Sequence, residues 1–162
     1  MIKISELALK YEPFKDGQDK IISDLVWRVF SEFEVPDYSE EGVNTFKEII
    51  VPERIAEKIK NEGFKVYCCF NESILVGVLG VRDKTHISLL FVDKRYHRKG
   101  IAKELLRLVI VDIQKFNPEL REITVNSSPY AVKIYEKLGF MAIDNMQEKD
   151  GIKYTPMKKS LM

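Results

Sequence analysis

The pattern of apolar and polar positions in the first sixty residues is that of helices. Apolar side chains recur every three or four positions over residues 18–33, which predicts a helix with one buried face. Pro36 interrupts this pattern, and Ser39 is a suitable residue to begin a second helical stretch. The sequence therefore predicts a short strand at residues 2–4 and helices over residues 18–33, 39–50 and 52–61.

After residue 64 the period of the pattern changes to that of strands. Residues 64–70 and 74–82 are rich in β-branched and aromatic side chains, and the polar residues 71–73 between them predict a hairpin. Gly77 and Gly80 lie inside the second strand, where glycine indicates a close packing approach or a bulge. The pattern then predicts strands at 85–92, 121–126, 140–147 and 152–159, and helices at 99–116 and 129–138.

The order of these elements predicts a single domain over residues 1–162. The class is α/β (α+β), with a mixed sheet and helices on both of its faces. A chain of 162 residues that is 45% hydrophobic and 31% charged has the composition of a globular protein with a substantial core.

Charge and hydropathy argue against several kinds of partner. The formal net charge is +1, whereas nucleic-acid surfaces are built from many uncompensated Lys and Arg side chains. The longest apolar runs are far shorter than the roughly 20 residues that a membrane-spanning helix needs. The first residues lack the apolar core of a signal peptide. We therefore expect a cytoplasmic protein that binds neither nucleic acid nor membranes.

The two cysteines, Cys68 and Cys69, are adjacent in a predicted strand, so their side chains should point to opposite faces of the sheet. The sequence has no C-x-x-C spacing and no nearby histidine cluster. We expect reduced, structural thiols and no metal site.

A basic turn between the predicted strand 85–92 and helix 99–116 has the features of an anion site. It reads His97-Arg98-Lys99-Gly100-Ile101-Ala102, and its small residues leave the backbone accessible. The first N–H groups of a helix have no intrahelical acceptor and lie at the positive end of its dipole, so they bind phosphate well. The two commonest phosphate motifs, G-x-G-x-x-G and G-x-x-x-x-G-K-[ST], are absent.

A second informative segment, residues 126–140, follows about 24 residues later. It reads Asn126-Ser127-Ser128-Pro129-Tyr130-Ala131-Val132-Lys133-Ile134-Tyr135-Glu136-Lys137-Leu138-Gly139-Phe140. Ser128 is a good N-cap, Pro129 suits the first helical position and Gly139 suits the C-cap, so the segment predicts a strand end followed by a short helix.

The ordered pair of segments resembles the two hallmark motifs of the GNAT acetyltransferase superfamily, over residues 85–140. His97 stands where that family usually has Gln or Arg. The resemblance implies a mostly antiparallel, mixed sheet of about six to seven strands. It also implies an N-acetyltransferase that moves an acetyl group from acetyl-CoA to a primary amine of a small molecule or peptide. The alternative is a non-catalytic CoA-binding sensor or scaffold protein.

The resemblance also implies roles for particular residues. Tyr135 corresponds to the acid that protonates the departing CoA thiolate, although a tyrosine at this spacing often only packs in a core. The main-chain N–H groups around residues 90–92 would meet the oxyanion and run alongside the pantetheine. The implied cofactor-binding residues are Leu90, Phe91, Val92, His97, Arg98, Lys99, Gly100, Ile101, Ala102, Asn126 and Ser128.

The base that deprotonates the amine has more than one candidate. His86 lies eleven residues before His97, at a position where members of the family place a glutamate, and histidine accepts a proton near neutral pH. Strand alternation, in the absence of a bulge, would place His86, Ser88 and Leu90 on one face, toward the substrate cleft. Glu34, at the end of the first helix, is the rival base, and ordered water is the third possibility.

The acceptor pocket is expected between the first two helices, because the family builds it there. Aromatic side chains would form its walls and a carboxylate would attract a cationic amine. The alternative for the aromatic residues is core packing. The identity of the amine and the oligomeric state stay open at this point, with a homodimer as one possibility. The predicted substrate-binding residues are Phe33, Glu34, Asp37, Tyr38 and Phe46.

Overall fold

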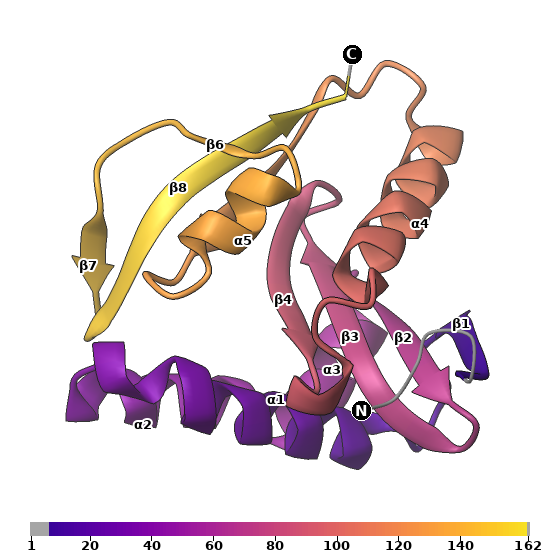
Figure 1. The fold of residues 1–162 in the computed structure, drawn as a ribbon, viewed down its shortest axis with the longest axis horizontal. Helices are drawn as coiled ribbons and strands as arrows, with labels where there is room; N and C mark the ends of the chain where they lie inside the picture. Colours follow the sequence, from indigo (N-terminus) through magenta and orange to yellow (C-terminus); the bar gives the residue numbers. More distant parts are fainter. Residues whose placement is uncertain (1–6, 162) are drawn as a thin grey trace.

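The computed structural model describes residues 7–161, so the strand predicted at residues 2–4 lies outside the described residues. The described chain forms eight strands and five α-helices (Figure 1). The strands are β1 (Leu9–Pro13), β2 (Lys65–Asn71), β3 (Ile74–Arg82), β4 (His86–Val92), β5 (Glu122–Ser127), β6 (Met141–Ala142), β7 (Gln147–Lys149) and β8 (Ile152–Ser160). The helices are α1 (Asp19–Phe33), α2 (Glu40–Ile49), α3 (Pro52–Asn61), α4 (Ile101–Phe116) and α5 (Val132–Lys137), with short 3-10 helices η2 (Val35–Asp37) and η3 (Lys94–Tyr96).

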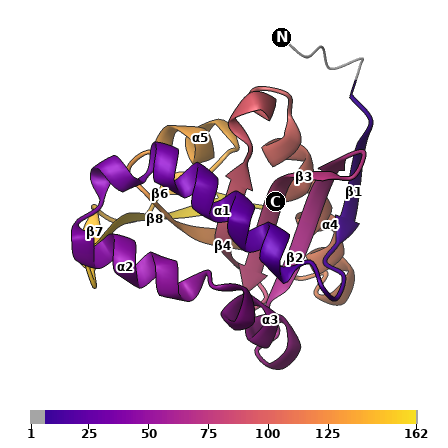
Figure 2. The ribbon, with the colours of Figure 1, turned by 90° about the horizontal axis from the view of Figure 1, so that it is seen from below.

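The helices cover both faces of the sheet, as predicted. Helices α1, α2 and α3 lie on one face, which Figure 2 shows in front of the strands, and α4 lies on the other. Each face has its own hydrophobic cluster. Cys68 belongs to the cluster under α1 and Cys69 to the cluster under α4, and both thiols are free. The prediction that the two cysteines face opposite sides is confirmed. Within residues 7–161, every helix falls short of the length and hydropathy that a membrane span requires.

The sheet is antiparallel except at its centre. The strand order is β1-β2-β3-β4-β5-β8-β6, and β7 pairs with β8. The parallel pair β4–β5 has only two residue pairs, His86 with Thr124 and Ile87 with Val125. Beyond Ile87 the two strands have no register partners in each other, so the rest of β4 has an edge that no strand of the described chain covers. This separation of β4 from β5 leaves backbone groups of β4 available at the candidate site.

A bulge in β4 changes which side chains share a face. Val81 pairs with Ile87 and Gly80 pairs with Leu89, so Ser88 is the extra residue. Ile87 consequently packs in the α4-side cluster, whereas Leu89 and Phe91 pack in the α1-side cluster. Leu90 packs on the α4 side. The prediction that His86, Ser88 and Leu90 share one face is therefore wrong, because it rested on unbroken alternation.

The two glycines of β3 mark close approaches, as their positions predict. A Cβ at Gly77 would lie 2.9 Å from Cγ2 of Ile101, the first residue of α4. A Cβ at Gly80 would lie 2.4 Å from the ring of Phe64. The absence of a side chain at Gly77 thereby lets the start of α4, and with it the end of the basic turn, pack closely against β3.

Candidate active site

The basic turn presents a row of main-chain amides with no acceptor. Arg98 and Gly100 both have a positive φ, of 61° and 79°, and α4 begins at Ile101. The first helical hydrogen bond runs from the amide of Glu104 to the carbonyl of Gly100, at 3.0 Å. The amides of residues 98–103 donate to no group of the described chain. Six consecutive free donors at the positive end of a sixteen-residue helix are a strong anion site.

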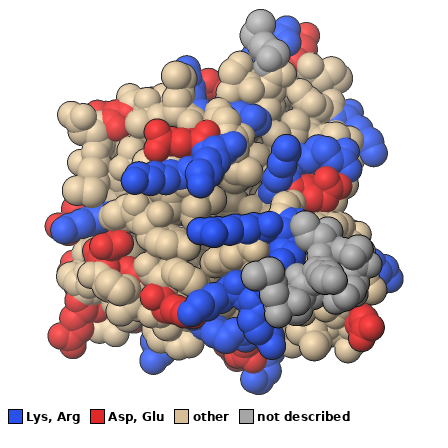
Figure 3. Space-filling model, in the orientation of Figure 1, with Lys and Arg blue, Asp and Glu red and all other residues tan. Residues whose placement is uncertain are grey.

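The surface around the turn is basic. Figure 3 shows Lys and Arg side chains gathered on the face that carries the turn and the start of α4. The sequence places Lys94, Arg95, Arg98 and Lys99 in this segment. The local charge therefore favours a polyanionic ligand although the chain as a whole is nearly neutral.

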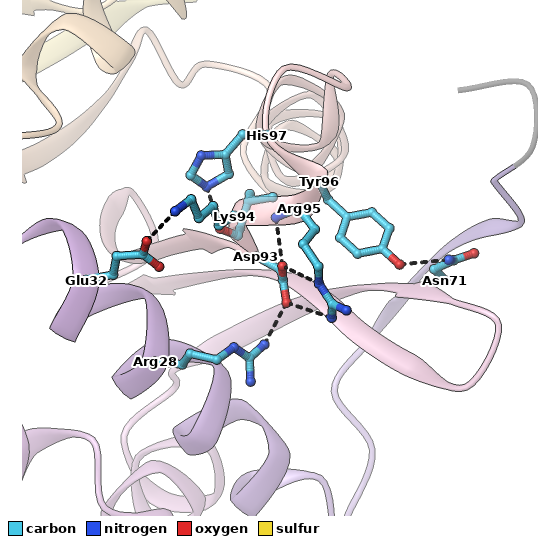
Figure 4. A network of polar contacts seen from close by, with 9 residues as sticks. Arg28, Glu32, Asn71, Asp93, Lys94, Arg95, Tyr96 and His97 are labelled. Carbon is cyan, nitrogen blue, oxygen red and sulfur yellow. Dashed lines mark hydrogen bonds and ion pairs between the residues drawn. The ribbon is translucent and has the colours of Figure 1, made fainter. Parts of the chain in front are cut away.

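Asp93 ties the base of the turn to the rest of the fold (Figure 4). Asp93 is 4% exposed, and its carboxylate accepts hydrogen bonds from the amide and the guanidinium of Arg95 and another from Arg28 at 2.8 Å. Burial acts to raise the pKa of Asp93, but the hydrogen bonds from Arg95 and Arg28 outweigh it and lower the pKa. Lys94 also pairs with Glu32 of α1, at 2.7 Å. These contacts hold the turn in place before any ligand arrives.

His97 connects the turn to α1 and to the open edge of β4. Its Nε2 lies 2.7 Å from the carbonyl oxygen of Val92, and its ring lies 5.2 Å from that of Phe33. Phe33 in turn stacks on Tyr130, with ring centroids 5.1 Å apart. Tyr130 is not among the predicted site residues, although it lies inside the second motif. The three rings form one wall beside the turn.

The uncovered edge of β4 presents amides toward the gap between β4 and β5. The amide of Asp93 donates to Val76 of β3 at 2.8 Å, and amide direction alternates along a strand. The amides of Val92 and Leu90 therefore point the other way, toward the gap. Among the residues predicted with them, Phe91 instead packs in the core, 8% exposed, with its ring 6.0 Å from that of Phe46.

Glu34, the residue that follows α1, has a carboxyl group with an unusual environment. Burial, together with the nearby charge of Asp37, raises the pKa of Glu34 from 4.5 to about 7, and the Ser128 hydroxyl only partly offsets this. Burial is also the main cause of the raised pKa values of Tyr38, Tyr130 and Tyr135, and the charge of Glu34 adds to each. These shifts place Glu34 among three phenols. Asp37 is exposed and contributes through its charge.

Tyr135 lies on α5 with its side chain 6% exposed and its ring edge-to-face against Phe140, 5.3 Å away. Its hydroxyl has no hydrogen-bond partner among the described residues. Every side-chain polar atom that is sealed from solvent in the described chain has such a partner, so this hydroxyl opens onto accessible space. The raised pKa keeps the phenol protonated at physiological pH.

A cavity of about 620 Å³ lies between the sheet and helices α2 and α3. Its walls include the predicted residues Tyr38, Phe46, His86, Asn126 and Ser128. Asn126 and Ser128, which were predicted to bind the cofactor, thus line this cavity, whereas the free amides of the basic turn belong to residues 98–103. The hairpin β7–β8 closes one side, because Ser39 and Thr45 of the α2 region donate hydrogen bonds to the carbonyls of Gly151 and Asp150.

His86 also lines this cavity, and its environment disfavours the protonated form, whereas that of Glu34 favours it. Its Nδ1 lies 2.8 Å from the Thr124 hydroxyl of β5. Burial, assisted by the charge of Arg82, lowers the pKa of His86 to about 4. The ring is therefore neutral at physiological pH and is a weak base. No group of three or more metal-ligating side chains occurs in the described part of the chain.

Comparison with known proteins identifies the family to which this chain belongs. Residues 34–161 match the sequence family described as the acetyltransferase (GNAT) domain. The match spans well over half of the chain and includes both motifs. The chain therefore belongs to the GNAT acetyltransferase family, and the predicted family and fold class are confirmed. No curated protein matches the sequence.

Solved structures of GNAT proteins share the whole fold at low sequence identity. A GCN5-related N-acetyltransferase from Rhodopseudomonas palustris superposes with a TM-score of 0.80 at 20% identity, over 99% of both chains. The PaiA N-acetyltransferase from Thermoplasma acidophilum, in complex with coenzyme A, gives 0.76 at 18% identity, over 95% of this chain and 99% of that one. A GNAT-family acetyltransferase from Staphylococcus aureus gives 0.73 at 17% identity, over 96% and 100%.

Proposed function

We propose that this protein is an N-acetyltransferase that takes its acetyl group from acetyl-CoA and transfers it to a primary amine. The observation that carries this proposal is the row of six free amides at residues 98–103, placed beside the uncovered edge of β4. A diphosphate fits the first feature and an extended amide-containing arm fits the second. The presence of coenzyme A in the PaiA structure supports the same use of the fold.

In the proposed complex the cofactor extends from the turn toward the crevice between Glu34 and Tyr135. The amides of residues 98–103 bind the diphosphate and the basic side chains add long-range attraction. The amides of Leu90 and Val92 hydrogen-bond the pantetheine arm or the thioester oxygen. Asp93 and His97 act as positioning residues, because each fixes the backbone of the turn or of β4.

The proposed chemistry is direct attack of the amine on the thioester. Glu34, ionised above pH 7, removes a proton from the ammonium form of the acceptor. The amine nitrogen forms a bond to the acetyl carbon, the carbon–sulfur bond breaks, and the amide product keeps the acetyl group. The Tyr135 phenol gives its proton to the leaving thiolate, and the second proton of the nitrogen passes to the phenolate oxygen that results. His86 remains neutral and serves as a cavity wall.

The first test is release of free thiol from acetyl-CoA in the presence of a broad panel of primary amines. We expect amine-dependent release. Coenzyme A binding without thiol release for any amine would contradict the enzymatic proposal and favour a sensor or scaffold. The cytoplasmic location and the homodimer stay predictions.

Substituting Tyr135→Phe should lower the single-turnover rate of acetyl transfer by about 100-fold, because it removes a hydrogen-bond donor that acts on the leaving group. The ring and its contact with Phe140 are kept. Coenzyme A affinity, measured by calorimetry, should change little. Tyr130→Phe is the matched control and should retain most of the rate. An unchanged rate in Tyr135→Phe would remove Tyr135 from the mechanism.

A further inference from the structure

The end of the cavity between α3 and the β3–β4 hairpin holds one cation that has no ion-pair partner among the described residues. The cations Lys58 of α3 and Arg82 of β3 line it, together with the carboxylates Glu62 and Asp83 and the neutral ring of His86. Lys58 is half-buried, and its ammonium group makes no hydrogen bond or ion pair with any described residue. A half-buried cation that faces a cavity without a partner indicates an anionic ligand.

The carboxylates near Lys58 are already engaged by other cations. Glu62 pairs with Arg54 through two contacts, and Asp83 pairs with Arg82 at 2.5 Å. Burial lowers the pKa of Lys58, the charges of Arg54 and Arg82 lower it further, and Glu62 offsets only part of this. Farther along the cavity wall, Lys149 and Asp150 contribute opposite charges. Among the described residues, the ammonium group of Lys58 thus has no ion pair of its own, because the nearby carboxylates pair with Arg54 and Arg82.

The other end of the same cavity reaches the site of proposed chemistry. Tyr38 and Ser128 line that end. The Ser128 hydroxyl hydrogen-bonds the Glu34 carboxyl group, and the charge of Glu34 acts on the Tyr38 phenol. His86 and Leu90 pair with Arg82 and Leu79 of β3, which are three residues apart because Ser88 is the bulge residue. At about 3.3 Å per residue of regular strand, the distance from His86 to the gap-facing amide of Leu90 is therefore roughly 10 Å. An acceptor that spans the cavity therefore has its amine and its far end separated by about this distance.

We propose that the acetyl acceptor carries a carboxylate about 10 Å from its reactive amine, and that Lys58 and Arg82 bind this carboxylate. The inference rests on the proposed function, because it takes the Glu34 end of the cavity as the place of acetyl transfer. The ammonium group of Lys58 and the guanidinium group of Arg82, which Asp83 partly neutralises, together match a single negative charge. A peptide of about three residues with a free carboxyl terminus has the required span, since an extended chain rises about 3.3–3.6 Å per residue.

The test compares Ala-Ala-Ala with its carboxyl-terminal amide as acceptors. We expect kcat/KM to be at least tenfold higher for the free acid, and we expect single alanine, which is too short to reach both ends, to be poor. Lys58→Gln should lower kcat/KM for the acid to about the level of the amide and leave the amide unaffected. Lys60→Gln, which removes the same charge from an exposed position of α3, is the matched control and should change neither. Equal kcat/KM for acid and amide in the wild type would overturn the proposal.

A binding measurement separates this proposal from the proposed activity. N-acetyl-trialanine and its amide are titrated calorimetrically into the protein saturated with coenzyme A. We expect tighter binding of the acid by tenfold or more, and loss of this difference in Lys58→Gln, whose melting temperature serves as the folding check. Equal binding, or no binding of either peptide, would overturn the carboxylate site. Preferential binding of the acid without any acetyl transfer would leave the carboxylate site standing and remove the proposed function.

Discussion

Replacing Glu34 with glutamine should reduce kcat/KM for acetyl transfer at pH 7.5 by about 100-fold to 1,000-fold. The wild-type carboxyl group has a pKa of about 7, so it is largely ionised at this pH and remains basic enough to accept a proton from an ammonium group. The side-chain amide of the variant has no such capacity. In the wild type kcat/KM should rise with pH through about 7, and this limb of the profile should be missing in the variant.

The same substitution should make the folded protein more stable at high pH. Because the folded-state pKa of Glu34 is raised from 4.5 to about 7, its burial costs no free energy below pH 4.5, costs progressively more between pH 4.5 and 7, and costs the full amount above pH 7. The free energy of unfolding of Glu34→Gln should exceed that of the wild type by about 1 to 3 kcal/mol at pH 8. At pH 4, where the carboxyl group is mostly protonated in both the folded and the unfolded state, the difference should nearly vanish. Urea unfolding at the two pH values measures it.

The control for both effects is Glu48→Gln, at an exposed position of α2. It should alter neither the pH profile nor the pH dependence of stability. If Glu34→Gln kept the wild-type pH profile of kcat/KM, the base would have to be another group or water.

Replacing Gly100 with valine should weaken coenzyme A binding by at least 100-fold, measured by calorimetry. Gly100 has a φ of 79°, and a Cβ at this position would meet no protein atom within 4 Å. The side chain would therefore project into open space beside the free amides, where the diphosphate is proposed to bind. The left-handed conformation also disfavours a β-branched residue, so the amides of the turn would lose their arrangement.

Gly17→Val separates the loss of binding from a general loss of stability. Gly17 also has a positive φ, of 92°, and a Cβ there would likewise meet nothing within 4 Å, but it lies in the connection between β1 and α1. Both variants should lose roughly 1 to 2 kcal/mol of stability. Only Gly100→Val should lose coenzyme A affinity. Normal affinity in Gly100→Val would contradict the assignment of the turn.

Most helices and strands could be predicted because their signals are local. The apolar spacing in 18–33 and the proline at the start of 52–61 define α1 and α3, and Ser39 caps α2 by accepting a hydrogen bond from the amide of Gly42. The end of the second motif was predicted less well. Helix α5 begins at Val132, because Ser128 caps a turn by accepting from the amide of Ala131 and the helix starts only after that turn.

Features that depend on pairing between distant segments were missed. Strand β1 has the alternating sequence Leu9-Lys10-Tyr11-Glu12, but only its pairing with β2 makes so short a segment a strand. The predicted strand 140–147 is divided into β6 and β7, because β8 pairs with both through different residues. The bulge at Ser88 arises from the register between β3 and β4, which no local pattern reports.

The candidate site likewise has parts that local sequence predicts and parts that depend on contacts between distant segments. The turn at 97–102 was predicted because its composition and position before a helix are local. The raised pKa of Glu34 was not predicted, because its main cause is burial, which arises only when segments distant in the sequence pack around the end of α1. The lowered pKa of His86 likewise depends on burial beside β5, whose Thr124 lies 38 residues farther along the chain. Lys58 had no local signal at all.

The parting of β4 and β5 leaves the middle of the sheet without one of its hydrogen-bonding partners. A thioester arm laid in this space would act as a surrogate strand, supplying the acceptors that a neighbouring chain segment would otherwise supply. Ligand would then belong to the folding equilibrium as well as to catalysis, with about 2.7 kcal/mol gained when its free concentration is 100 times its Kd. The concentration of the acyl donor would then shift the balance between folded and unfolded molecules.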